Sequence, residues 1–209
     1  MKRISFAFGK PNVAQRGAAV VELALVVPLF LVLLFGTMEF GRLIYLWNTV
    51  QEVTRSAARQ AVVTNFRDAD QIACIKLAAV FRRPLSPPCS GSVGLLPAAS
   101  EITSAMVNIS YLDAGKNVIP RASWPTDPGD NIAACLDATR TASCIRFVQV
   151  CVSNDSACPS DQSQSIAYVP MIGFLSATAG SFSPLSLNIS IPNSTVIMPA
   201  ESLGYRPSI

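Results

Sequence analysis

The stretch QRGAAVVELALVVPLFLVLLFGTMEFGR, residues 15–42, decides the fold of this chain. From Ala18 to Met38 it has 21 residues, and Glu22 is the one charged residue among them. A helix of this length rises about 31 Å, enough to cross a bilayer core of about 30 Å. The stretch therefore predicts a membrane-spanning helix with a carboxylate near its start, where a charge is costly.

Two residues in this stretch, Pro28 and Gly36, weaken a helix in water. Membrane helices tolerate both, because lipid offers the backbone N–H and C=O groups no water to bond to, and the helix therefore remains the favoured conformation. We expect a kink or a local loosening near Pro28.

The apolar pattern continues beyond Arg42 with three-and-four spacing, which is typical of an amphipathic helix. Tyr45 and Trp47 are placed where interfacial aromatic residues lie. The simplest interpretation is one long helix over 18–64, with its first half in lipid and its second half outside. The apolar positions of the second half are Leu43, Leu46, Trp47, Val50, Val53, Ala57, Ala61 and Val62.

A shorter helix is predicted over 68–82, capped by Asp68 or Asp70 and stopped by Pro84. The β-branched and alternating runs beyond it indicate a β-rich remainder, so the fold class is α+β. The expected strands are 106–112, 145–152, 185–191 and 195–198, the last two forming a hairpin, and residues 84–100 and 120–130 are expected to be irregular.

Charge is concentrated at the N-terminus. Of 16 basic residues, Lys2, Arg3, Lys10 and Arg16 precede the first acidic residue, which leaves 12 basic against 13 acidic residues from Ala18 onward. A basic end before a membrane segment is expected in the cytoplasm. The formal charge of +3 gives no reason to expect nucleic acid as a partner.

The chain has no histidine, which removes histidine triads, bases and metal ligands. No activated nucleophile or cofactor motif is recognisable, so we expect no enzyme activity, no cofactor and no metal. Asp127, Asp130 and Asp137 are close enough in sequence to consider a cation, but Pro128 and the lack of a ligand periodicity favour a solvated turn.

Six cysteines all follow the apolar stretch, which favours disulfides in an oxidising compartment over a zinc site. Six cysteines allow 15 connectivities. We favour three local pairs, because short separations are easily closed. These pairs are Cys74 with Cys89, Cys135 with Cys144, and Cys151 with Cys158.

The N-terminus does not follow the pattern of a secretory signal. The apolar run is longer than a usual signal core, and no cleavage site of small residues follows it. The change from basic to apolar sequence falls at Gly17, and Glu22 comes five residues later. Cleavage at this junction would leave the apolar helix on the mature protein.

These features resemble the N-terminus of type IV pilin-like proteins and, more narrowly, of the TadE-like pseudopilins of tight-adherence (Flp) pili. The resemblance runs from Arg16 to Arg42 almost without gaps, and includes Pro28, Gly36 and the EFGR run at 39–42. Beyond residue 64 only the segments FVQVCV, YVPMIGFL and NSTVIMPAE are similar to the family.

The resemblance implies cleavage by a prepilin peptidase between Gly17 and Ala18. It also implies that Glu22 pairs with the new amine on Ala18, in its own or a neighbouring subunit. The alternative is that Glu22 lies near the headgroups, where a negative charge suits the helix dipole. Glu39 and Arg42, three residues apart, are expected to form an interfacial pair with a structural role.

The expected organisation is a basic leader at 1–17, a transmembrane helix at 18–46, its amphipathic continuation at 47–66 and a pilin-like α+β domain at 67–209. The expected location is the bacterial inner membrane, with the N-terminus cytoplasmic and the domain periplasmic or carried into an extracellular pilus. The resemblance implies a minor pilin or pseudopilin in assembly, initiation or tip capping of the pilus or of the related secretion system.

The partners implied are the prepilin peptidase, the major Flp pilin, other pseudopilins, the inner-membrane platform and the lipid bilayer. The alternative function is an uncleaved, membrane-anchored periplasmic binding or adhesion protein. A membrane-tethered enzyme is the third possibility, and the missing histidine counts against it.

Overall fold

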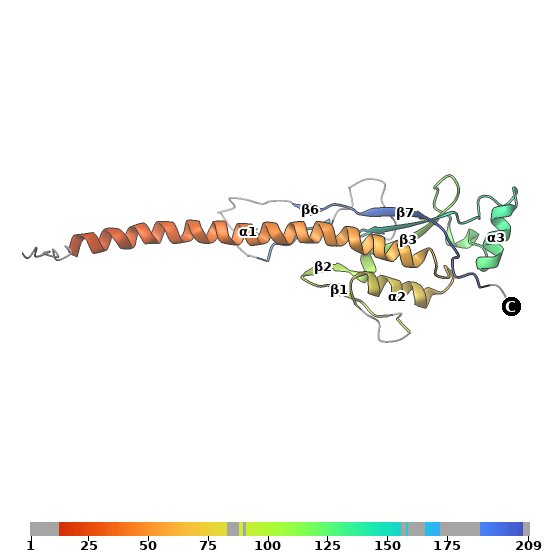
Figure 1. The fold of residues 1–209 in the computed structure, drawn as a ribbon, viewed down its shortest axis with the longest axis horizontal. Helices are drawn as coiled ribbons and strands as arrows, with labels where there is room; N and C mark the ends of the chain where they lie inside the picture. Colours follow the sequence, from red (N-terminus) through yellow and green to blue (C-terminus); the bar gives the residue numbers. More distant parts are fainter. Residues whose placement is uncertain are drawn as a thin grey trace, which may run out of the picture. The chain divides into compact units, whose positions relative to one another are not determined.

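The computed structural model describes residues 13–82, 88–89, 91–155, 158, 166–171 and 189–206. It divides into two compact units, Met1–Arg42 and Leu43–Ile209, and the second of these is called the outer unit. The first contains the beginning of a long helix, and the second joins the end of that helix to three small sheets and two shorter helices (Figure 1).

The long helix α1 spans Val13–Ala61 and continues through Pro28. It begins before Ala18, the start expected from the sequence, and ends before residue 64. Its last turn is followed by a turn in which Thr64 donates its hydroxyl to the carbonyl of Gln60. Of the basic residues of the expected leader, Lys2, Arg3 and Lys10 lie outside the described residues and Arg16 lies in α1.

The second half of α1 buries one face in the core of the outer unit. The buried residues recur every three or four positions, as predicted: Leu43, Leu46, Val50, Val53, Ala57, Ala61 and, just beyond the helix, Val62. Trp47, expected on this face, is 39% exposed, because it lies beside the buried stripe. Small residues at the end of the stripe allow close packing on α1.

Helix α2, Ala69–Ala79, confirms the short helix predicted after the long one. The Asp68 side chain accepts from the backbone N–H groups of Asp70 and Gln71, so Asp68 is the N-cap. The helix ends earlier than residue 82 because Phe81 adopts a left-handed conformation with φ of 59°. Pro84, the expected stop, lies outside the described residues.

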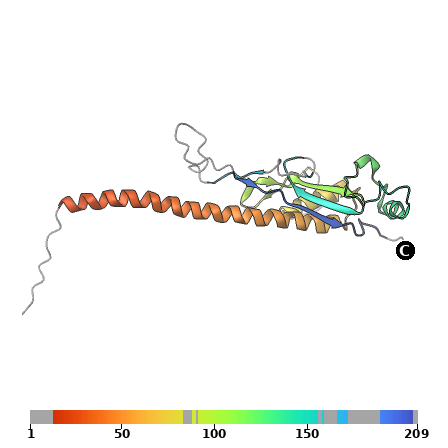
Figure 2. The same ribbon diagram turned by 90° about the horizontal axis from the view of Figure 1, so that it is seen from above.

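The main sheet is antiparallel and has the strand order β3-β4-β7. Its strands are β3 Val107–Leu112, β4 Phe147–Val152 and β7 Thr195–Pro199. All three were predicted from the sequence. Figure 2 shows β4 between β3 and β7, with the sheet beside the second half of α1. Val148 and Val150 of the central strand are fully buried.

The predicted hairpin of 185–191 with 195–198 is wrong. Strand β6, Ser190–Ile191, pairs with β5, Ile166–Ala167, whereas β7 pairs with β4. Local alternation identified strand residues correctly, but the pairing partner is chosen by burial against the rest of the domain. Residues 185–188 lie outside the described residues.

Both segments expected to be irregular contain regular structure. Residues 84–100 include β1, Leu95–Leu96, and the start of β2, Ala99–Thr103, which form a small hairpin. Residues 120–130 include the 3-10 helix η2, Arg121–Ser123, and the first residues of α3, Pro128–Leu136. A second 3-10 helix, η1, covers Ser104–Met106. Asp127 caps α3 and Pro128 occupies its first turn, a helix-start signal that the Pro-rich context obscured.

Three disulfides connect the cysteines, and each joins two residues that are near in sequence. They are Cys74–Cys89, Cys135–Cys144 and Cys151–Cys158, the local pairs that the sequence favoured. All lie in the outer unit. Together with the sheets and the long helix they give the α+β, disulfide-containing fold expected from the sequence.

The C-terminal segment 200–206 covers the end of α1. The backbone N–H groups of Glu201 and Leu203 both donate to the carbonyl of Val62, at 3.2 and 3.1 Å. Leu203 is buried. Gly204 has a φ of +83°, and a Cβ there would lie 2.7 Å from the backbone nitrogen of Asn65. The segment therefore satisfies a helix-end carbonyl and requires glycine where it passes Asn65.

We predict that Gly204→Ala destabilises the outer unit more than Gly91→Ala. Both glycines have a φ of +83°, but a Cβ on Gly91 would meet nothing within 4 Å. The left-handed conformation alone costs about 1–2 kcal/mol, and the clash with Asn65 adds about 1–3 kcal/mol. Urea unfolding of the full-length protein in detergent micelles measures both losses, and equal losses would show that the contact at Asn65 does not matter.

Candidate functional site

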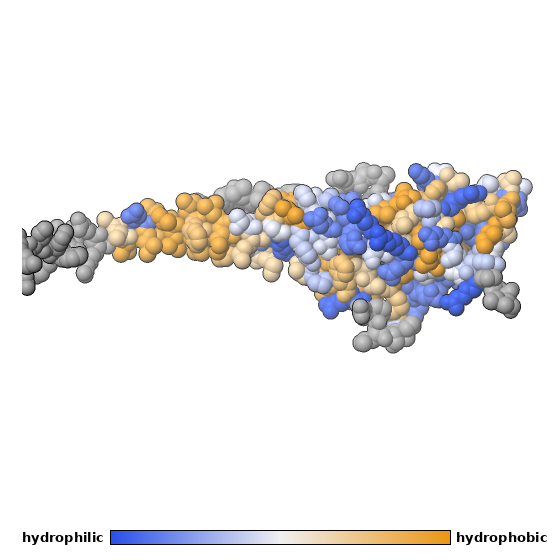
Figure 3. All heavy atoms as spheres, in the orientation of Figure 1, coloured by the Kyte–Doolittle hydropathy of each residue, from blue (hydrophilic) through white to orange (hydrophobic). Residues whose placement is uncertain are grey.

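Residues 18–34 of α1 present an apolar surface with one charged residue. The side chains from Ala18 to Leu34 are exposed. In the described part of the chain, α1 is the one helix long and apolar enough to cross a membrane, and its most apolar window has a mean hydropathy of 2.8 with none of it buried. Figure 3 shows this surface in orange, with a hydrophilic residue near its start.

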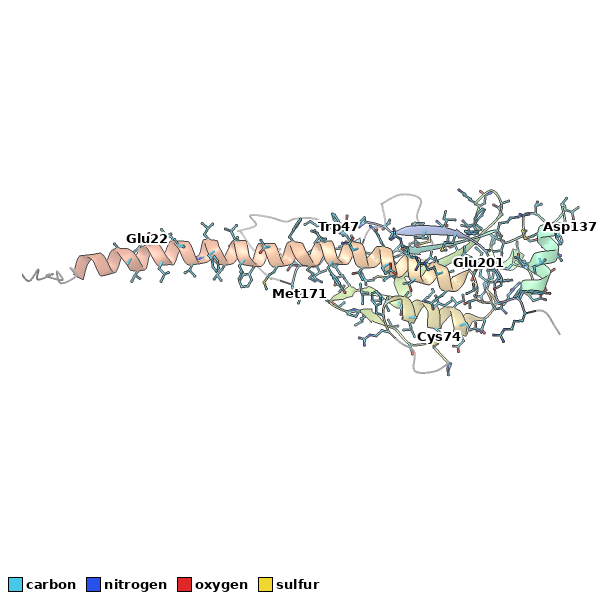
Figure 4. The ribbon with its side chains drawn as sticks, in the orientation of Figure 1. Glu22, Trp47, Cys74, Asp137, Met171 and Glu201 are labelled. Atoms are coloured by element: carbon cyan, nitrogen blue, oxygen red, sulfur yellow. A yellow bond between two sulfur atoms is a disulfide. The ribbon has the colours of Figure 1, made fainter. Side chains whose placement is uncertain are left out.

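Glu22 is the charged residue of this surface, and Figure 4 shows it labelled near the beginning of α1. Ala18 lies four residues before Glu22 on the helix. Residues at this spacing are neighbours on one face, with about 5–6 Å between their Cβ atoms. The helix therefore brings the carboxylate to the side of Ala18, the residue expected to carry the new amine.

Gly17, the residue expected before the cleaved bond, lies inside α1 and not before it. A Cβ at Gly17 would meet nothing within 4 Å, so no packing contact requires glycine there. Glycine has a low helix propensity, about 1 kcal/mol less favourable than alanine. It is therefore a position at which the start of the helix opens readily.

Glu39 and Arg42 form an ion pair across one turn of α1, with Arg42 Nη1 3.4 Å from Glu39 Oε1. Their side chains are only 12% and 13% exposed, so the pair expected from the sequence is largely covered.

The acidic residues between 127 and 137 are used for local structure. Asp127 accepts from the backbone N–H of Asp130 at the start of α3, and Asp137 accepts from Thr139. Asp130 Oδ1 lies 2.9 Å from Arg140 Nη1. Among the residues that the structure describes, no cluster of His, Cys, Asp or Glu has the arrangement of a metal site.

A cluster that the sequence did not reveal fixes the connection between β3 and α3. Arg67 donates to the carbonyls of Pro125 and Trp124, at 2.8 and 2.7 Å. The Trp124 ring packs edge-to-face on Tyr111, with 4.9 Å between centroids, and on Phe66. Burial raises the pKa of the Tyr111 hydroxyl well above its usual range. The one sequence signal was an isolated tryptophan in a Pro-rich segment, which does not identify its partners.

We predict that Arg140→Gln raises the pKa of Asp130. The hydrogen bond from the Arg140 guanidinium, followed by that from the Thr126 amide, lowers this pKa to about 2. The resulting stabilisation is complete above the unfolded pKa of about 3.9 and is lost as the pH falls from there toward 2. Without Arg140 the pKa moves up toward about 3.9, and the acid-side loss of stability shrinks.

Carboxyl NMR titration of the full-length protein in micelles measures this change. The control is Asp113, whose pKa is lowered chiefly by the backbone N–H of Asn117 and should not move. An unchanged Asp130 titration in Arg140→Gln would contradict the assigned cause.

Comparison with known families shows a protein family that the helix is similar to. The family model described as TadE-like protein matches residues 17–59, nearly all of α1 beyond its first turn. This match confirms the resemblance seen in the sequence. No curated protein and no solved structure matches the chain.

Proposed function

We propose that this TadE-like chain is a minor pilin or pseudopilin that acts in assembly, initiation or tip capping of a tight-adherence pilus. One observation carries the proposal: the family match covers residues 17–59 of α1, and Glu22 is the one charged residue in the apolar part of this helix, from Ala18 to Met38. Helices of this kind associate through apolar surfaces, and their charges are retained for pairing. The proposed role is structural and not catalytic.

Processing by a prepilin peptidase would hydrolyse the bond between Gly17 and Ala18. Water adds across the bond, leaving a carboxylate on Gly17 and an amine on Ala18 that is protonated near neutral pH. Because Gly17 lies inside α1, the first turns must open before the bond enters a peptidase. Fraying at a helix end with a glycine makes this opening inexpensive.

Glu22 would then pair with the Ala18 amine. An ionised side chain at the centre of a bilayer costs about 2.5–3.5 kcal/mol on insertion scales. Pairing with a cation offsets this cost, either within the same helix or with the amine of a neighbouring subunit. The second arrangement would fix the axial position of one subunit against the next, which gives the carboxylate a role in assembly.

The proposed location is the inner membrane, with residues 18–46 in or at the bilayer. The basic residues Lys2, Arg3, Lys10 and Arg16 favour a cytoplasmic N-terminus. The three disulfides favour an oxidising compartment for the outer unit, which is the periplasm or the pilus surface. The partners of this role are the prepilin peptidase, the major Flp pilin, other pseudopilins and the inner-membrane platform.

One observation favours the second candidate, an uncleaved membrane-anchored binding or adhesion protein. Gly17 lies within a continuous helix, so the bond after it is less accessible than in an extended leader. In that case Glu22 would lie near the headgroups in the first turns of the anchor, and α1 would serve only to hold the outer unit at the membrane.

We predict that Glu22→Gln lowers the number of pili per cell at least tenfold in the native host, while the protein still inserts in the membrane. Glutamine keeps the shape of glutamate but cannot pair with the Ala18 amine as an anion. Glu22→Asp, which keeps the charge, should retain part of the activity.

Pili are counted by electron microscopy, and immunoblots of membrane fractions establish that each variant is present. The control is Val20→Leu, which changes a neighbouring exposed side chain without changing charge. Normal piliation by Glu22→Gln would rule out the pairing role.

A further inference from the structure

Among the residues that the structure describes, strand β7 forms an edge of the main sheet, because it pairs with β4 on one side and with no strand on the other. Ser194 accepts from the N–H of Val152, and the N–H of Ala200 donates to Arg146. In an antiparallel pair these bonds alternate along the strand. Val196 and Met198 are therefore bonded to β4, and the backbone groups of Thr195 and Ile197 point away from it.

This edge has few of the features that normally keep the edge strand of a sheet from pairing with another chain. Natural edges are blunted by charged side chains, bulges, proline or short length. β7 is short and ends at Pro199, but it has no charged residue and its pairing with β4 is regular. Thr195 and Ile197 are exposed, Ile197 to 43%. The edge therefore offers two donors and two acceptors to an added strand.

A groove of about 250 Å³ lies at the beginning of β7. Trp47, Gln51 and Arg55 of α1 form one wall, and Ser194 and Thr195 are on the other side. Thr54 Oγ1 and Ser194 Oγ, 2.8 Å apart, join α1 to this end of the strand. Arg55 is exposed, and the described residues that line the groove include no carboxylate, so the groove is complementary to an acidic side chain.

A second groove, of about 520 Å³, lies at the end of β7. Its apolar lining includes Ile132 and Leu136 of α3, Phe147 of β4 and Pro199. Helix α3 turns the polar Asn131 inward, where its side-chain oxygen accepts from the N–H of Ile145 at 2.8 Å. Leu136 is left 84% exposed and Ile132 45%. A large apolar side chain fits this groove. Figure 4 labels Trp47 and Glu201, which belong to the two grooves, near opposite ends of β7.

We propose that β7 binds an extended segment of a partner polypeptide as an added strand. The segment's backbone pairs with Thr195 and Ile197, an acidic side chain lies against Arg55, and a large apolar side chain enters the groove beside Leu136. In this mode the backbone bonds supply affinity and the grooves at either end supply specificity. The binding site does not depend on cleavage after Gly17, so it stands apart from the proposed function.

Amide hydrogen exchange of the full-length chain tests the proposal, read at single residues by fragmentation mass spectrometry. In the chain purified alone in detergent micelles, Thr195 and Ile197 should exchange fast and Val196 and Met198 slowly. In host membranes, Thr195 and Ile197 should slow at least tenfold. Unchanged exchange of these two amides in host membranes would overturn the proposal.

Two variants test whether the slowed exchange at Thr195 and Ile197 depends on the two grooves. Arg55→Glu and Leu136→Ser should each restore fast exchange at Thr195 and Ile197 in host membranes. Their controls are Arg59→Glu, an exposed arginine one turn from Arg55 outside the groove, and Val93→Ser, an apolar residue that is 67% exposed on another part of the outer unit. The controls should keep the protection.

Three other outcomes would overturn the proposal. Protection that survives both groove variants would place the contact elsewhere. Slow exchange at Thr195 and Ile197 in the purified chain would mean that its own residues cover the edge. Protection that rises with the concentration of the purified chain would assign the edge to a second copy.

Discussion

The outer unit depends on the burial of one stripe of α1 against the sheet. Leu46, Val50 and Val53 are almost completely buried, and the valines of β4 pack in the same core. Burying each such side chain contributes roughly 1.5–3 kcal/mol. Apart from Glu22, the same helix is apolar on all sides from Ala18 to Met38, and beyond Arg42 it is apolar on one face. This change gives one continuous element the composition of a membrane segment at one end and a face for the core of a folded domain at the other.

The sequence predicted the structural elements that are determined by residues near one another in the chain. The three-and-four spacing after Leu43 gave the buried stripe, Asp68 gave the start of α2, and the β-branched run at 147–152 gave the central strand. Short separations favoured the three disulfides that the structure contains. Each of these features is decided within a few residues, where capping, periodicity and chain closure act.

Features decided by distant contacts were missed. The sequence next to β7 suggested a hairpin, but the strand pairs with β4, more than 40 residues away, because that pairing adds Val196 and Met198 to the core. Trp124 and Arg67 are 57 residues apart and gave no sign of their contact. In the candidate site, the spacing of Ala18 and Glu22 followed from helix geometry, whereas the position of Gly17 inside α1 did not, because helix starts are weakly encoded.

The state of the N-terminus in native membranes tests the central claim most directly. Intact mass combined with N-terminal sequencing of the protein from its host gives the first residue and the oxidation state of the cysteines together. A chain that begins at Ala18 and lacks six thiol hydrogens is the predicted result, since it requires both processing after Gly17 and three disulfides. A chain that still begins at Met1 would contradict the pilin-like account and leave α1 as the anchor of a periplasmic binding protein.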